Sequence, residues 1–247
     1  MKTSGNTILI TGGGSGIGRE LAQRFHDLGN VVIVAGRTLA SLEETIAGRA
    51  NMHALTFDAS DAASISAFAA EAIARFPAMN VLFNNAGIMD REDVTQGGDI
   101  SVAERTIVTN MLGPIRLTNA LIDHLSAQDD AAIVNTTSGL AFVPLLTAPS
   151  YSASKAGLHF WTVALREQLA GKVEVIELAP PAVRTELTPG QSARENYMPL
   201  DDYANEVMSL FAQVPTPREI LVNNVLFLRN AEREGRFDEA VKAIGAL

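Results

Sequence analysis

Tyr151 and Lys155, two side chains that can exchange protons, stand four residues apart in the stretch 149–157. On a helix, residues i and i+4 lie one above the other on the same face. An ammonium held beside a phenol favours the phenolate, so we expect the pKa of Tyr151 to fall from its free value of about 10 toward the working pH. The pair predicts a phenol that gives a proton to a carbonyl or takes one from an alcohol.

A glycine-rich turn near the N-terminus provides a place for a nucleotide. The segment 11–18 reads TGGGSGIG, between an expected strand over 7–11 and an expected helix over 16–28. Glycines let the backbone approach a pyrophosphate, and a helix N-terminus adds free N–H groups and a positive dipole end. Such a turn can be a plain connection, but this one lies in the N-terminal strand–helix–strand unit, as dinucleotide binding requires. The expected contacts are Gly12, Gly14, Ser15, Gly16, Ile17 and Gly18.

The end of the second strand, expected over 31–35, indicates which nicotinamide cofactor is bound. An NAD site usually has an acid there for the ribose 2′-hydroxyl, whereas a 2′-phosphate needs a basic group. This strand is followed by Gly36 and Arg37, with no acid. Because a guanidinium can bind a phosphate through two hydrogen bonds, we predict NADP(H) in preference to NAD(H). The alternative is that Arg37 is a solvated loop residue.

The residue after the third strand, expected over 53–57, has two interpretations. Asp58 and Ala59 stand where the edge of an adenine could be bound. Asp58 could equally cap the following helix, in competition with Ser60 and Asp61.

A small-residue turn after the fourth strand, expected over 81–84, suits the close approach of a ribose. Its residues are Asn85, Ala86 and Gly87.

Two further polar residues could serve the phenol. Asn110 lies among apolar residues of an expected helix over 101–127, where a buried amide needs a partner, and it could instead bond its own backbone. Ser138 follows a strand expected over 132–137 and precedes Tyr151 by 13 residues. It could hydrogen-bond the oxygen that Tyr151 addresses, or only cap the end of its strand.

The elements that must position these residues alternate along the chain. Strands are expected over 7–11, 31–35, 53–57, 81–84, 132–137 and 173–178, and helices over 16–28, 38–47, 61–76, 101–127 and 152–170. Near-continuous Val, Ile and Leu runs suit a parallel sheet covered on both faces, and the alternation implies right-handed crossovers. We predict one α/β domain over 1–247 with a doubly wound, mostly parallel sheet of the Rossmann type. Ligands of such sheets bind at the carboxyl ends of the strands, where the residues above stand.

The pattern weakens after residue 184. The segment 185–200 is rich in Pro, Gly, Asn and Ser and is expected to be a lid or substrate loop. The segment 201–247 is expected to be variable, with a helix over 201–214, a last strand within 220–227 that Asn223 and Asn224 interrupt or end, and a helix over 236–246.

Composition limits the class of protein. The chain has 247 residues, 47% of them hydrophobic and 19% charged, a net charge of −9 and no cysteine. An acidic chain does not favour a nucleic-acid or anionic-membrane partner. No disulfide or thiol catalyst is expected, and the four scattered histidines lack metal-ligand spacing, so no metal is expected. No signal peptide and no apolar run of ~18 residues is present, which predicts a soluble cytoplasmic protein.

The motifs together resemble the short-chain dehydrogenase/reductase family, in its short single-domain branch. The resemblance covers about residues 6–185 and rests on the glycine turn, Asp58, the Asn84-Asn-Ala-Gly87 turn, Asn110, Ser138 and the Tyr151-x-x-x-Lys155 motif, in family order and spacing. The stretches 138–144 and 179–183 further resemble a subgroup of bacterial oxidoreductases associated with D-alanine export clusters.

The resemblance implies a tetrad of catalytic residues. Tyr151 would be the acid or base, and Lys155 would lower its pKa and bind the nicotinamide ribose. Ser138 would orient the substrate oxygen, and Asn110 would hold a water that relays protons to Lys155.

The chain departs from the family at two places. Pro181 stands where the family has glycine after the sixth strand, and its ring removes an N–H beside the carboxamide; Val183 and Thr185 are still expected to serve the cofactor. The family's common C-terminal strand ending in Asp-Gly-Gly is replaced by 221–228. This replacement leaves the usual tetramer in doubt, so a homodimer through the helices at 101–127 and 152–170 is predicted, with a tetramer as the alternative.

These inferences predict an NADP-dependent oxidoreductase that interconverts a carbonyl and a secondary alcohol of a partly apolar small molecule. The expected pocket walls are Leu140, Phe142, Val143, Pro144 and Leu145, with Tyr197 and Met198 in the lid. The alternatives are a non-catalytic dinucleotide-binding sensor or scaffold, and an epimerase or dehydratase that retains its cofactor.

Overall fold

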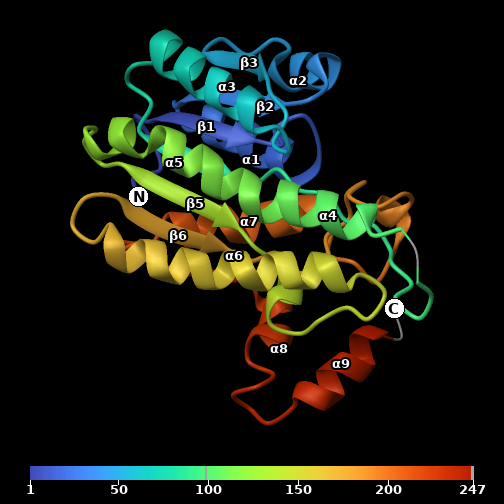
Figure 1. The fold of residues 1–247 in the computed structure, drawn as a ribbon. Helices are drawn as coiled ribbons and strands as arrows, with labels where there is room; N and C mark the ends of the chain where they lie inside the picture. The colour runs from blue at the N-terminus through green and yellow to red at the C-terminus, as the bar shows by residue number, and fades with distance from the viewer. Residues whose placement is uncertain (98, 246–247) are drawn as a thin grey trace.

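One parallel sheet organises the chain. The computed structural model describes residues 1–97 and 99–245, and within them seven parallel strands are ordered β3-β2-β1-β4-β5-β6-β7 (Figure 1). The strands are β1 (Thr7–Thr11), β2 (Val31–Gly36), β3 (Met52–Thr56), β4 (Val81–Asn84), β5 (Ala132–Thr136), β6 (Glu174–Leu178) and β7 (Glu219–Ile220). Strand order reverses between β1 and β4, which puts the switch point of the sheet between their carboxyl ends. The predicted doubly wound single-domain fold is confirmed.

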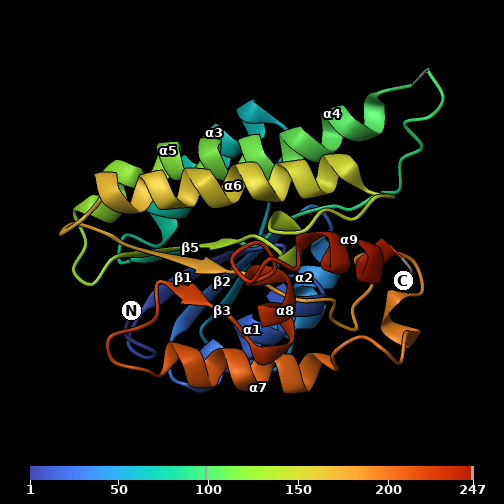
Figure 2. The same cartoon turned by 90° about the horizontal axis from the view of Figure 1, so that it is seen from below.

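Helices cover both faces of the sheet, as Figure 2 shows. One face carries α1 (Gly16–Asp27), α2 (Leu39–Ile46) and α7 (Leu200–Phe211), and the other carries α3 (Ala62–Arg75), α4 (Ser101–Ile107), α5 (Gly113–Ser126) and α6 (Pro149–Gln168). Side chains alternate across each strand, so Ile8 and Ile10 of β1 pack with Phe25, whereas Leu9 packs with Leu121. Both cores therefore meet on the same strands and hold the strand ends in fixed relation.

Two helices differ from their predicted bounds in ways that concern the site. α6 begins at Pro149, whose fixed φ and missing N–H suit the first helical position, and Tyr151 therefore lies in the first turn. The helix predicted over 101–127 is interrupted by a π-helical turn, Val108–Leu112, which carries Asn110. Single π turns inside helices occur frequently at functional sites.

The C-terminal segment leaves the sheet early. The strand predicted within 220–227 is wrong beyond Ile220, because a 3₁₀ turn (Asn223–Val225) and α8 (Leu226–Arg229) follow. The backbone N–H of Asn223 donates to Glu206 Oε1 at 2.6 Å, so it cannot extend the ladder with β6. α9 (Phe237–Gly245) ends the described chain, and residue 246 of the predicted helix lies outside it.

α8 and α9 lie beyond the sheet and below α6 in Figure 1. They form a small separate core in which Val143 packs with Ala231, Ala240 and Ile244. Among the helices of the described chain, none has the length and apolar character needed to cross a membrane.

Candidate active site

A cleft of about 550 Å³ opens at the carboxyl ends of the strands, with a hollow of about 180 Å³ beside it. The loops after β1, β2, β4, β5 and β6 line the cleft, and the loop after β3 lines the hollow. Eighteen of the predicted residues line the cleft, the hollow or both: Gly12, Gly14, Ser15, Gly16, Ile17, Gly18, Arg37, Asp58, Ala59, Asn85, Ala86, Gly87, Ser138, Tyr151, Lys155, Pro181, Val183 and Thr185.

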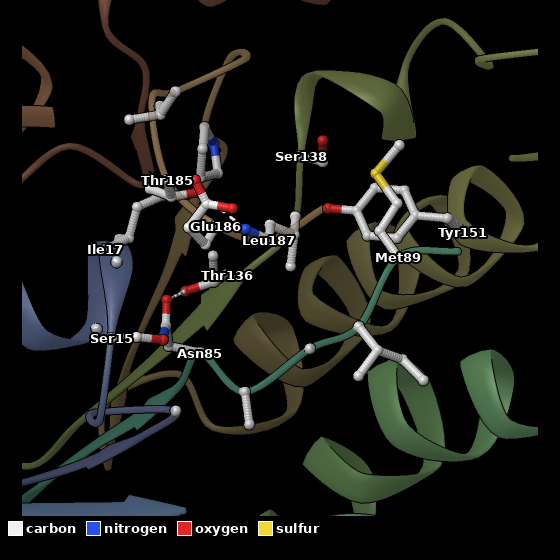
Figure 3. A pocket seen from close by; sticks show the side chains of 18 of the residues that line it. Ser15, Ile17, Asn85, Met89, Thr136, Ser138, Tyr151, Thr185, Glu186 and Leu187 are labelled. Carbon is white, nitrogen blue, oxygen red and sulfur yellow. Dashed lines mark hydrogen bonds between the residues drawn. The ribbon is translucent and has the colours of Figure 1, made fainter. Parts of the chain in front are cut away.

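The phenol of Tyr151 points into the cleft, and Figure 3 shows Thr185 and Glu186 on the other side. The Ser138 hydroxyl lies on the same side of the cleft as the phenol, and its proximity acts to lower the pKa of Tyr151. Ser138 ends its strand with extended backbone, and its Oγ also accepts the N–H of Leu140 at 3.1 Å. The capping interpretation of Ser138 is therefore confirmed, and its bond to the substrate oxygen stays a prediction.

Lys155 lies one helical turn after Tyr151 and is 3% exposed. Its Nζ donates to the carbonyl of Thr136 at 2.8 Å and lies 5.7 Å from the centroid of the Tyr151 ring. Burial lowers the pKa of Lys155 to about 8. The i, i+4 pair thus shares one face as predicted, with the ammonium bonded to the strand rather than to the phenol.

The predicted direction of the Tyr151 pKa is wrong for this arrangement. Burial raises the pKa of Tyr151 to about 12, and the effect of Ser138 only partly offsets that rise. The phenol is 6% exposed, so the phenolate would lose its hydration, and the Lys155 ammonium is directed at Thr136. At neutral pH the phenol is therefore a proton donor.

Asn110 is fully buried and does not line the cleft. Its Nδ2 donates to the carbonyl of Ile88 at 2.8 Å and to Ser154 Oγ at 3.3 Å, and its Oδ1 accepts the Ile88 N–H at 2.9 Å. The alternative in which Asn110 bonds its own backbone is wrong, because the amide bonds the segment after β4. Asn110 thereby connects that segment to α6, which carries Tyr151 and Lys155.

The glycine turn is fitted closely to the segment after β4. Gly12 has a φ of 69°, and an added Cβ there would lie 2.9 Å from Ala86 Cα. An added Cβ at Gly18 would lie 2.2 Å from the Gly12 carbonyl oxygen. Asn85 fixes the same approach, because its N–H donates to Thr11 Oγ1 at 2.9 Å and its Nδ2 to the Thr11 carbonyl at 3.1 Å.

The N-terminus of α1 faces the cleft at Ser15, whose side chain makes no capping hydrogen bond. Its free N–H groups and dipole can therefore bind an anion. A narrow glycine-lined cradle beside such a terminus fits a pyrophosphate, so these residues suit a dinucleotide.

The end of β2 carries a cation and no acid. Arg37 is exposed and lines both the cleft and the hollow. The carboxylate of Asp58 accepts the N–H of Ser60 at 2.8 Å and its hydroxyl at 2.7 Å. These bonds, followed by the charge of Arg37, lower the pKa of Asp58. The capping alternative for Asp58 is wrong, since Asp61 caps α3 by accepting two backbone N–H groups.

The loop after β6 is braced by a residue that the sequence did not single out. Gln191 is buried and lines the cleft, and its Nε2 donates to the carbonyl of Val183 at 2.8 Å and to Thr185 Oγ1 at 3.3 Å. Its position in a loop of polar residues gave no signal, because its role depends on the folded path of 183–191. Tyr197 and Met198, predicted in the lid, do not line the cleft, and Met198 instead forms a β-bridge with Val183.

The predicted pocket walls at 140–145 are also wrong. These residues do not line the cleft; Val143 is buried in the C-terminal core, and the Phe142 ring lies 4.7 Å from the guanidinium carbon of Arg229. α8 and α9 cover this segment, and nothing in its sequence indicates that cover. Residues that do line the cleft without having been predicted include Ile88, Met89, Asp90, Arg105, Glu186 and Leu187.

One histidine has a neighbourhood that its spacing in the sequence does not reveal. His159, Glu177 and Glu219 have ligand atoms within 4.8 Å of one another. Arg229, however, donates to both oxygens of Glu219, at 2.9 and 3.0 Å. The group is therefore a hydrogen-bonded ion-pair network, and a cation would have to displace the guanidinium.

Known proteins share this fold and these motifs. The family model for short chain dehydrogenases matches residues 6–196. Over 189 residues the chain is 45% identical to the uncharacterized oxidoreductase DltE of Bacillus subtilis (strain 168), covering 76% of this chain and 75% of that protein. This similarity agrees with the subgroup resemblance drawn from 138–144 and 179–183.

Solved structures agree at the level of the fold. A short chain dehydrogenase/reductase from Burkholderia phymatum in complex with NAD has a TM-score of 0.83 and 23% identity, covering 96% of each chain. An alcohol dehydrogenase from Thermococcus sibiricus complexed with 5-hydroxy-NADP has a TM-score of 0.75 and 24% identity, covering 86% of this chain and 92% of that one. With the motif residues gathered at one cleft and the family model matched, the chain belongs to the short-chain dehydrogenase/reductase family of oxidoreductases.

Proposed function

We propose that this protein is an NADP(H)-dependent oxidoreductase that interconverts a carbonyl and a secondary alcohol. The observation that carries the proposal is that Tyr151, Ser138 and Lys155 line the same cleft as the glycine turn. A bound nicotinamide supplies or accepts the hydride. The protein would supply the proton, the orientation of the oxygen and the exclusion of water.

Each residue of the tetrad has a proposed role that follows from its contacts. The Tyr151 phenol, protonated at neutral pH, would donate its proton to the carbonyl oxygen during reduction. Ser138 would hydrogen-bond the same oxygen and stabilise its developing charge. Lys155, held by Thr136, would bring a positive charge and a donor to the ribose beside Tyr151. Asn110 would hold the segment after β4 against α6, and we keep as a proposal that it also holds a proton-relaying water.

The preference for NADP(H) rests on Arg37. An exposed guanidinium at the end of β2, with no acid on that strand end, favours a 2′-phosphate over a free 2′-hydroxyl. Thr38 and Ser41, which line the same hollow, offer further hydroxyl groups. Asp58 would bind the adenine edge, although its carboxylate is already bonded to Ser60.

The substrate is proposed to be a small molecule of mixed polarity. Met89, Ile88 and Leu187 give the cleft an apolar part, as a partly apolar substrate requires. Asp90, Arg105 and Glu186 add charge, and Arg105 is paired with Asp90 at 3.0 Å. The segment 185–200 is proposed to cover this end, with Leu187 as its contact.

The oligomeric state and the cellular location of the protein are also proposals. A homodimer through the helices of 101–127 and 152–170, with a tetramer as the alternative, is supported by Phe160 of α6, which is 72% exposed. Light scattering in solution measures the molar mass of the assembly and so tests the proposed oligomeric state. The absence of cysteine agrees with a cytoplasmic location.

Turnover of carbonyl compounds tests the reaction. NADPH oxidation should be measured with a panel of aldehydes and ketones that includes apolar and anionic members. Tyr151→Phe is expected to lower kcat by about 10²- to 10⁴-fold, because it removes the proton donor, while NADP still binds. Retained turnover in that variant, or none by the parent protein with any carbonyl, would contradict the proposal.

Cofactor affinity tests the phosphate preference. Calorimetry with NADP and NAD should give tighter binding of NADP to the parent protein. Arg37→Ala is expected to weaken NADP binding by about 10-fold or more and to leave NAD binding unchanged, since a charge-assisted bond is lost only with the phosphate. Equal affinities of the parent protein for both nucleotides would remove the case for NADP.

A further inference from the structure

A fully buried carboxylate lies in β6, outside the cleft. Glu177 has no exposed surface and does not line the cleft or the hollow. Taking an ionised carboxylate out of water is unfavourable unless its oxygens are hydrogen-bonded and its charge is balanced. The partners of Glu177 therefore indicate what its burial does.

Glu177 bonds two different elements at once. Thr137 Oγ1 donates to its Oε1 at 2.6 Å, and His159 Nδ1 lies 3.0 and 2.8 Å from its two oxygens. An ionised carboxylate only accepts hydrogen bonds, so Nδ1 of His159 carries a proton and is the donor in this pair. Arg229, which pairs with Glu219, adds a nearby positive charge.

Both partners are adjacent to the proposed catalytic residues. Thr137 directly precedes Ser138, and its N–H donates to the carbonyl of Leu178 at 2.8 Å. His159 stands four residues after Lys155 and eight after Tyr151 on α6. Residues at this spacing share the helix face that is turned to the sheet. One carboxylate thus joins the segment that carries Ser138 to the helix that carries Tyr151.

We propose that Glu177 and His159 are positioning residues that set the separation of the Ser138 hydroxyl and the Tyr151 phenol. For turnover the inference rests on the proposed function, because the two hydroxyls must reach the same substrate oxygen. Proton transfer tolerates little displacement, and a shift of about 1 Å in such a site lowers the rate by about 10²-fold. The hydrogen bonds of this network do not involve the glycine turn, so we expect nucleotide binding not to depend on it.

Matched histidine variants test the proposal by kinetics. His159→Leu removes the bond to Glu177, whereas His159→Asn keeps an N–H donor near the position of Nδ1. His124→Leu is the control, because His124 bonds the Met79 carbonyl at 3.0 Å and joins α5 to the opposite end of the sheet. We expect His159→Leu to lower kcat by about 10- to 100-fold with an unchanged Kd for NADP, and His159→Asn to recover most of that loss. His124→Leu should keep the parent kcat.

Three kinetic results would overturn the proposal. The first is a parent-like kcat in folded His159→Leu, and the second is an equal loss in His124→Leu. The third is a loss of NADP affinity in parallel with kcat. The kcat of Glu177→Gln, which keeps the shape of the side chain without its charge, is measured as well. If that variant does not fold, the histidine variants alone test the proposal.

A spectroscopic measurement separates this inference from the proposed reaction. The chain has three tyrosines, so incorporation of meta-fluorotyrosine gives three fluorine resonances, and Tyr151→Phe assigns that of Tyr151. We expect His159→Leu to shift the Tyr151 resonance and to leave that of Tyr197 in place. An unshifted Tyr151 resonance would overturn the positioning role. A shift in a protein that turns over no carbonyl would support the role while the proposed function fails.

Discussion

The nucleotide end of the cleft and its substrate end are built by different means. The nucleotide end, formed by the turn 11–18 and the ends of β2 and β4, consists largely of backbone and small residues. The substrate end brings Met89, Arg105, Tyr151 and Leu187 together from four separate segments. Lys155 and Glu177 add two buried, ionisable side chains to the elements that carry it. A local pattern can encode the first kind of site, whereas the second depends on how distant elements pack.

The largest effect is expected from the addition of a single methyl group at the nucleotide end. Gly18→Ala would put a Cβ 2.2 Å from the Gly12 carbonyl oxygen and 2.6 Å from Asn85 Nδ2. Overpacking against backbone has no flexible side chain to absorb it, so we expect loss of NADP binding and destabilisation by about 1–3 kcal/mol or more. Thermal unfolding with and without NADP measures both effects.

Gly97→Ala is the control for that substitution, because an added Cβ there meets no described atom within 4 Å. It should behave as the parent protein. Unchanged NADP binding by Gly18→Ala would contradict the proposed dependence of this end on the close backbone fit at Gly18.

A pH titration of stability sharpens the comparison at the substrate end. The pKa of folded Lys155 is about 8, below the value of about 10.4 for a lysine in an unfolded chain. Below pH 8 both states are protonated, and folding carries the penalty of burying the ammonium; between about 8 and 10.4 the folded state loses its proton first and the penalty fades. Lys155→Met should therefore be more stable than the parent by about 2 kcal/mol near pH 7, with the difference shrinking as pH rises.

Denaturant unfolding at several pH values, without added nucleotide, measures that difference. Lys172→Met, on an exposed surface, should show none. A constant difference across the range would contradict the buried ammonium as its cause.

The smallest effects are expected from two substitutions that compare the predicted pocket wall, at 140–145, with the observed lining at Leu187. Val143→Ala should lower the free energy of unfolding by about 1–2 kcal/mol, because Val143 fills the core under α8 and α9, and should leave KM unchanged. Leu187→Ala should change KM and leave the free energy of unfolding nearly unchanged, since Leu187 is 39% exposed and lines the cleft. A change in KM for Val143→Ala would restore the segment 140–145 to the substrate pocket.

The sequence by itself determined the fold class, the six long strands and the residues of the nucleotide end. These follow from short-range causes: apolar runs predict buried parallel strands, and glycines at a strand–helix junction permit a backbone that other residues cannot adopt. Tyr151 and Lys155 were found for the same reason, because a spacing of four residues on a helix fixes their common face.

The tertiary structure alone decided the remainder. The bonds of Asn110 to Ile88, the support of Val183 by Gln191 and the covering of Val143 by α9 all join residues that no local pattern relates. The direction of the Tyr151 pKa shift was also decided by packing, because burial of the phenol outweighs the effect of Ser138. The network of Glu177, His159 and Thr137 was decided by packing as well, since a charge inside a sheet persists only where the folded chain brings its partners to it.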